Sequence, residues 1–140
     1  MHAKQFTRGM RVGVPICLGY LAVSFTLGIT AKNAGLSAFQ ATLTSLLVNA
    51  SAGQYAAFTL MAAQGGYLEM ALLTLVTNAR YLLMSCSLSQ KLSPQTRLWQ
   101  RCTVGFAVTD EMFGMAIAER QDLSPFYYFG MMTVAMPGWA

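Results

Sequence analysis

Long stretches without charged residues dominate the chain and define its expected elements. Uncharged runs cover residues 12–31, 33–68 and 123–140, and the segment 70–90 contains a single charge, Arg80. Runs of this length suit membrane-spanning helices, which need about 20 apolar residues, better than the shorter core helices of soluble proteins. The pattern predicts apolar helical segments at about 12–31, 38–66, 69–88 and 102–118, and a fifth that begins at Leu123. We therefore expect an all-α fold, a polytopic helical bundle integral to a membrane.

The second apolar stretch, residues 38–66, is unusual because it carries no charge and yet many polar side chains. Its centre reads Asn-Ala-Ser-Ala-Gly-Gln-Tyr over residues 49–55, a poor surface to present to lipid. One interpretation is a close-packed helical seam, since small or polar residues recur every four positions from Ser45 to Ala57. The other is a broken or re-entrant helix whose irregular backbone lines a cavity. The distribution of basic residues favours the break.

The basic residues bear on topology through the positive-inside rule. Lys4, Arg8 and Arg11 precede the first span, which predicts a cytoplasmic N-terminus. If every apolar stretch crossed once, the basic loop of residues 91–101 would lie outside. If residues 38–66 instead re-enter, or cross as two short halves, that loop returns to the cytoplasmic side. We therefore expect a break in the second segment.

Composition narrows the function classes. The chain has 140 residues, of which 55% are hydrophobic and 10% charged, and the formal net charge of +4 is dispersed over loops without forming a nucleic-acid-binding face. The three cysteines show no C-x-x-C spacing, and the one histidine lies at position 2, so we expect no metal and no cofactor. Hydrolase and metalloprotease motifs are absent from the sequence, which disfavours an enzyme.

A charged group stands out within the apolar segments. Arg80 at membrane depth costs roughly 2.5–3.5 kcal/mol on insertion scales, so it calls for a partner. It lies 11 residues before Lys91, and Glu111 lies 10 residues after Arg101, which places both at similar depth if the connecting loop is at the surface. Neighbouring helical residues diverge by about 100°, so only one of Asp110 and Glu111 can face Arg80. The other is left for a cavity, a cation, a proton or a second subunit.

Two hypotheses account for this group. In the first, the ion pair only fixes helix packing, as it would in a non-transporting structural subunit or in a channel. In the second, Arg80 binds a carboxylate with its planar guanidinium, while an acid binds an ammonium group or carries a proton. A polar discontinuity beside a midplane arginine–acid pair suits a zwitterion. The candidate substrate-binding or ion-coupling residues are Asn49, Ser51, Gln54, Tyr55, Asn78, Arg80, Asp110 and Glu111.

Several short motifs follow one another along the chain in a specific order. They are Gly19-Tyr20, Ala50-Ser51-Ala52-Gly53-Gln54-Tyr55, Asn78-Ala79-Arg80-Tyr81 and Thr109-Asp110-Glu111. Over about residues 10–119, their order and spacing resemble the AzlC family of branched-chain amino acid permeases. Ser51 departs from that family's pattern, which commonly has glycine there, and Tyr81 stands where a histidine often follows the arginine.

The resemblance implies the large subunit of an AzlC/AzlD-type exporter. Its expected activity is ion-gradient-coupled export of branched-chain amino acids, with methionine as a further candidate, across a bacterial inner membrane. It also implies a small multi-pass AzlD-type partner subunit. Because the sequence stops inside the fifth apolar segment, we expect residues 1–140 to form a single membrane domain, the N-terminal part of such a permease.

Overall fold

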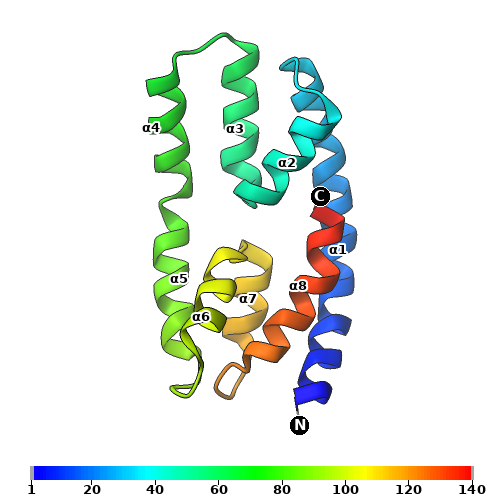
Figure 1. Ribbon diagram of the computed structural model, residues 1–140, viewed down its shortest axis with the longest axis vertical. Helices are drawn as coiled ribbons and strands as arrows, with labels where there is room; N and C mark the ends of the chain where they lie inside the picture. Colours follow the sequence, from blue (N-terminus) through cyan, green and yellow to red (C-terminus); the bar gives the residue numbers. More distant parts are fainter. Residues whose placement is uncertain (1, 140) are drawn as a thin grey trace.

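The chain folds as helices joined by short turns in a computed structural model that describes residues 2–139 (Figure 1). This part of the chain contains eight helices: α1 (His2–Asn33), α2 (Ala38–Val48), α3 (Ser51–Ala62), α4 (Tyr67–Asn78), α5 (Arg80–Lys91), α6 (Leu98–Phe106), α7 (Asp110–Ala118) and α8 (Pro125–Trp139). The only β-type pairing among the described residues is one isolated bridge between Leu92 and Leu123. The predicted all-α class is therefore confirmed.

Two helical segments have the length and composition needed to cross a membrane. They are α1 and the continuous stretch Tyr67–Lys91, which joins α4 to α5. Both carry large exposed apolar side chains, among them Phe25, Leu75 and Leu83, as a lipid-facing surface requires. The N-terminal residues, expected as a tail before the first span, already belong to α1, and Pro15 lies inside that helix.

The second apolar segment is broken, as the sequence predicts. Ser37 and Gln40 form a capping box that starts α2, and α2 ends at Asn49, whose φ of 44° and ψ of 33° are left-handed. Asparagine tolerates this conformation better than most residues, so it can end a helix without glycine. The chain then reverses, and α3 returns beside α2 toward the same end of the molecule (Figure 1). The alternative of one continuous seam from Ser45 to Ala57 is wrong.

The fourth apolar segment is also broken, and here the prediction of one helix over residues 102–118 is wrong. α6 ends at Phe106, and α7 begins at Asp110 with the Thr109 side chain accepting a hydrogen bond from Met112 N at 3.4 Å. A threonine followed by two acids favours a helix start over a helix interior. α7 then returns to the end of α5, where Lys91 Nζ donates to the carbonyl oxygens of Ile117 and Glu119.

The described residues thus form two helical hairpins, α2–α3 and α6–α7, which extend toward the middle of the molecule from its opposite ends. The α2–α3 hairpin starts at the end of α1, and the α6–α7 hairpin starts at the end that holds the N-terminus (Figure 1). Their tips face each other at mid-height, level with a local irregularity between α4 and α5. There Ala79 N and Leu82 N donate to carbonyls three residues earlier, those of Val76 and Ala79. Three helix irregularities therefore lie in the middle of the molecule.

α8 packs along α1, and glycines allow their backbones to approach closely. A Cβ atom at Gly9 would overlap the carbonyl oxygen of Tyr127, and one at Gly130 would overlap the carbonyl oxygen of Phe6. Such contacts between small residues are the usual means of close helix packing in membranes. The adjoining core is formed by Val104, Ala107, Met112, Ala116, Tyr128 and Met131.

We expect Gly130→Ala to destabilise the protein, because the added methyl group would push α1 and α8 apart. Overpacking of this kind costs about 1–3 kcal/mol. The matched control is Gly28→Ala, a position in α1 with nothing within 4 Å of a Cβ atom. The check is the midpoint of thermal unfolding in detergent, followed by size-exclusion chromatography. Equal midpoints for the two variants would contradict the close α1–α8 contact.

Candidate functional site

The helix irregularities bring a charged pair to the middle of the molecule. Arg80 is the first residue of α5 and Asp110 the first residue of α7, and Arg80 Nη1 lies 3.0 Å from Asp110 Oδ2. The side chains remain 44% and 46% exposed, so the pair can be reached from outside. The Arg80 guanidinium also lies over the ring of Tyr81, 5.2 Å from its centre. The pairing of Arg80 with one of the two acids, expected from their depth, is present and uses Asp110.

Glu111, the neighbouring acid, faces a different set of groups. Its Oε2 lies 2.9 Å from the hydroxyl of Tyr20 on α1, and the same hydroxyl lies 2.5 Å from Thr109 Oγ1. Glu111 also lines a cavity of about 720 Å³ that extends along α1 from Arg11 to Val23. The two acids are adjacent in sequence but have separate environments, because successive helical residues point in different directions.

The first turn of α7 gives both acids a favourable electrostatic position. Asp110 and Glu111 lie at the helix N-terminus, where the unpaired N–H groups carry partial positive charge. Anions at this end of a helix are stabilised, and Thr109 supplies the cap. Within residues 2–139, three or more His, Cys, Asp or Glu side chains do not come together as a group that would hold a metal ion.

The tip of the α2–α3 hairpin carries buried polar atoms. Asn49 is 5% exposed and Gln54 is 1% exposed. Gln54 Nε2 donates to Ser45 Oγ at 2.7 Å, but Gln54 Oε1 and Asn49 Nδ2 have no hydrogen-bond partner among the described residues. Buried polar atoms are normally satisfied by protein, water or ligand. The tip is thus equipped to hold a polar molecule.

Asn78 connects this hairpin tip to the charged pair. It is the last residue of α4, two positions before Arg80, and its side chain packs against Gly53 of α3. A Cβ atom at Gly53 would lie 2.5 Å from Asn78 Oδ1, so only glycine permits this approach. Asn78 Oδ1 is buried and has no hydrogen-bond partner among the described residues.

Ser51 and Tyr55 lie on another side of α3. They line a separate cavity of about 510 Å³ with Val23 and Thr26 of α1, and Tyr55 is 51% exposed. Of the predicted site residues, Arg80 contacts Asp110, and Asn78 packs against Gly53 in the α2–α3 hairpin. Ser51 and Tyr55 are directed toward α1.

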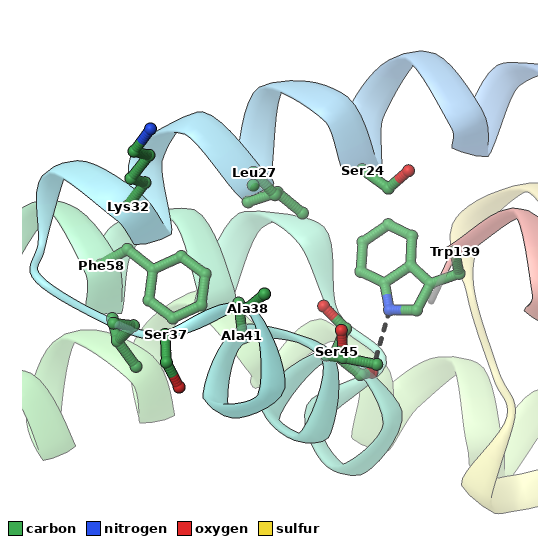
Figure 2. Close-up of a pocket in the computed structure, with 12 residues that line it drawn as sticks. Ser24, Leu27, Lys32, Ser37, Ala38, Ala41, Ser45, Phe58 and Trp139 are labelled. Carbon is green, nitrogen blue, oxygen red and sulfur yellow. Dashed lines mark hydrogen bonds between the residues drawn. The ribbon is translucent and has the colours of Figure 1, made fainter.

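Aromatic side chains outside the predicted site form hydrogen bonds near the tips of both hairpins. The indole N–H of Trp139 donates to the carbonyl oxygen of Ser45 at 3.0 Å, at the edge of a cavity of about 490 Å³ between α1, α2 and α3 (Figure 2). The Trp139 ring lies 5.3 Å from that of Tyr20, edge to face. The Tyr128 hydroxyl donates to the carbonyl oxygen of Ala107 at 3.1 Å, at the end of α6. Tyr20 belongs to the Gly19-Tyr20 motif, which was its one sequence signal, whereas Trp139 had none.

The fold and site define a helical membrane protein with two hairpins whose tips face each other and a charged pair between α5 and the tip of the α6–α7 hairpin. Comparison with known families places it further: the family described as AzlC protein matches residues 15–140. The chain belongs to the AzlC family, as its motifs predict.

Several relatives carry membrane-protein names. An "Uncharacterized membrane protein" of Archaeoglobus fulgidus is 32% identical over 113 residues, covering 81% of this chain and 49% of the relative. "Inner membrane protein YgaZ" of Escherichia coli K12 is 30% identical over 115 residues, covering 81% and 46%. A membrane protein of Helicobacter pylori is 29% identical over 112 residues, covering 80% and 48%. The chain therefore spans about half the length of the curated relatives it matches, and no solved structure matches it.

We expect Arg80→Ala to lower the amount of folded protein in the membrane, because Asp110 would be left without its partner. An unpaired charge at depth costs about 2.5–3.5 kcal/mol on insertion scales. Adding Asp110→Asn should restore most of the loss, whereas adding Glu111→Gln should not, since Glu111 has other partners. Membrane-inserted protein and its thermal midpoint are the measurements. Equal rescue by the two acid variants would contradict the specific Arg80–Asp110 pair.

Proposed function

We propose that the protein is a transport subunit that exports branched-chain amino acids across the bacterial inner membrane, coupled to an ion gradient. Methionine is a further candidate substrate. The observation that carries the proposal is the half-exposed Arg80–Asp110 pair, held at the level where two helical hairpins meet. Discontinuous helices near the midplane are a recurrent way for secondary transporters to bind substrates and ions.

The charges around this pair match both ends of an amino acid. The Arg80 guanidinium presents a planar set of donors suited to a carboxylate. Asp110 supplies an acceptor for an ammonium group. A substrate that enters between them would exchange one ion pair for two, so that no charge is left unpaired at depth. The polar atoms of Asn49, Gln54 and Asn78 lie on the adjoining hairpin and helix end.

A partner subunit fits the exposure of the site. Arg80 and Asp110 are nearly half exposed on a chain whose outer faces are apolar. Charged side chains at membrane depth normally face protein or a water-filled cavity. We propose that a small multi-pass subunit of the AzlD type covers this side, as the family resemblance implies.

The orientation follows from the positions of the basic residues. The start of α1 is tied to the end of α7 by Arg8, whose guanidinium donates to both carboxylate oxygens of Glu119 at 2.7 and 3.0 Å. Lys91 contacts the same end of α7. Lys4, Arg11 and the basic loop therefore share one end of the molecule, and we propose that this end is cytoplasmic. The re-entrant second segment supports this assignment, because it removes one crossing.

The function is tested by efflux of labelled leucine, valine and methionine. Cells that produce the protein with an AzlD-type subunit should release these amino acids in a saturable manner that a protonophore abolishes. Arg80→Ala should reduce the rate by about tenfold or more, since a charged hydrogen-bonding contact to substrate would be lost.

Glu69→Gln serves as the control, because Glu69 lies at the start of α4, far from the pair along the chain. Release that does not saturate would favour a channel. Absence of release from the unaltered protein would leave a structural membrane subunit and would contradict the proposal.

The orientation is tested separately with single cysteines. The three native cysteines are replaced by alanine, and one cysteine is introduced at Gln95 in the basic loop or at Tyr67, the first residue of α4, both exposed positions. A membrane-impermeant maleimide added to intact spheroplasts should label the cysteine at position 67 only. Position 95 should react only after the membrane is opened. Labelling of position 95 from the outside, with position 67 protected, is the result expected of a second segment that crosses once and would contradict the re-entrant arrangement.

A further inference from the structure

We propose that Glu111, Tyr20 and Thr109 form a proton-binding site, in which Glu111 carries the proton and Tyr20 positions its carboxylate. This inference deepens the proposed transport function and rests on it, since it names the coupling ion. It assigns different roles to two adjacent acids: Asp110 pairs with Arg80, and Glu111 carries the proton.

The Tyr20 hydroxyl has two hydrogen-bonding neighbours on the first turn of α7. This hydroxyl is within reach of both Glu111 Oε2 and Thr109 Oγ1, at 2.9 and 2.5 Å, but it has only one proton to donate. In one of the two contacts the Tyr20 oxygen must therefore be the hydrogen-bond acceptor. Whether it accepts from Thr109 or from Glu111 depends on whether Glu111 holds a proton.

Two arrangements give the Tyr20 hydroxyl one donor and one acceptor. When Glu111 is ionised, it can only accept, so Tyr20 donates to Glu111 and Thr109 donates to Tyr20. When Glu111 binds a proton from water, its new hydroxyl donates to Tyr20, and Tyr20 donates to Thr109. The chain of hydrogen bonds thus reverses direction without moving a heavy atom. Thr109 Oγ1 also accepts from Met112 N, so the reversal acts directly on the N-terminal cap of α7.

The cavity next to Glu111 supplies a route for the proton. Its lining on α1 runs through Arg11, Pro15, Gly19 and Val23, one helical face, from the basic end of the molecule to the level of Glu111. A volume of about 720 Å³ exceeds what one water molecule requires. Asp110, in contrast, is occupied by Arg80 on the side of α5.

The helices that pack against α7 carry several charged and titratable groups near its first turn. α1 contributes Tyr20 and Arg11, α5 contributes Arg80 and Tyr81, and α8 contributes Tyr128, which donates its hydroxyl proton to Ala107 O. Of these cations, Arg80 already forms an ion pair, and its partner is Asp110. The group that contacts Glu111 directly and is free to change its hydrogen bond is Tyr20.

Tyr20 also connects this site to the other hairpin. Its ring packs edge to face on Trp139, whose indole donates to the Ser45 carbonyl near the end of α2. Glu111 lies at the tip of the α6–α7 hairpin, and three successive contacts, through Tyr20 and Trp139, link it to Ser45 near the tip of the α2–α3 hairpin. This is the position that an ion-coupling residue needs, because coupling requires that the ion bias the same elements that bind substrate.

The test is infrared difference spectroscopy of the purified protein in lipid nanodiscs, titrated between acid and alkaline pH. The unaltered protein should show a carboxyl C=O band that titrates as one group and is lost in Glu111→Gln. The Asp110→Asn variant should retain that band. Tyr20→Phe should keep the band but displace its midpoint by about one pH unit, the effect of losing one hydrogen bond to a charged group. Tyr67→Phe, a highly exposed tyrosine, is the matched control and should displace nothing.

A second arm measures leucine flux driven by a pH gradient in proteoliposomes with the partner subunit. Glu111→Gln should lower it by at least about tenfold, the scale of a lost acid–base group. A band that disappears in Asp110→Asn instead, an unmoved midpoint in Tyr20→Phe, or a midpoint that shifts with sodium concentration would overturn the proposal. If the titration is as expected but the unaltered protein carries no leucine, the proton site stands and the amino acid substrate is wrong.

Discussion

Hydrogen-bond satisfaction of the backbone is the constraint on which this structure depends. Inside a bilayer, helix ends have no water to complete their bonds, so breaks at depth must be covered by protein or line a cavity. Here aromatic side chains contribute: Tyr128 donates to the Ala107 carbonyl at the end of α6, and Trp139 adds a second donor to the Ser45 carbonyl, which already accepts from Asn49 N at the end of α2. Both aromatics belong to α8, which glycines hold tightly against α1. The α1–α8 contact therefore supports both hairpin tips.

The two hairpin tips differ in charge, and this difference organises the middle of the molecule. α7 begins with two acids and a threonine cap, whereas the first turn of α3 has no acid and Ala50 provides no side-chain cap. Arg80 begins α5 at the same level. Negative charge is thus concentrated on the α6–α7 hairpin, where Arg80 pairs with Asp110, while the buried amides of Asn49, Gln54 and Asn78 lie in or against the α2–α3 hairpin. A division of this kind supports a zwitterionic substrate, whose two charges need opposite partners a short distance apart.

Much of this arrangement could be predicted from composition, and the remainder depends on packing. The break near Asn49 was predictable because polar residues at depth and the basic loop both favoured it. The Arg80–acid pair was predictable from equal depth, and it holds because α6 climbs to that level before the chain turns back. The break at Thr109 was missed because residues 102–118 are apolar enough for one span, and Thr109-Asp110-Glu111 was interpreted as a functional cluster, not as a helix start. The contacts of Tyr20 with Trp139 arise only when α8 packs on α1, which no local pattern indicates.

The order of elements explains why the charges gather where they do. α1 followed by α2–α3, and α4–α5 followed by α6–α7, are each a long helix and a re-entrant hairpin, and they run in opposite directions (Figure 1). In this inverted arrangement each hairpin occupies one end of the molecule. Residues of both units come together at the level between the two tips. A charged side chain at a tip meets partners from the other unit there, as Tyr20 of α1 meets Thr109 and Glu111 of the second hairpin. The Tyr20–Glu111 contact therefore accommodates a charge at depth and also joins the two inverted units, whereas the Arg80–Asp110 pair lies within the second unit and fixes its hairpin against α5.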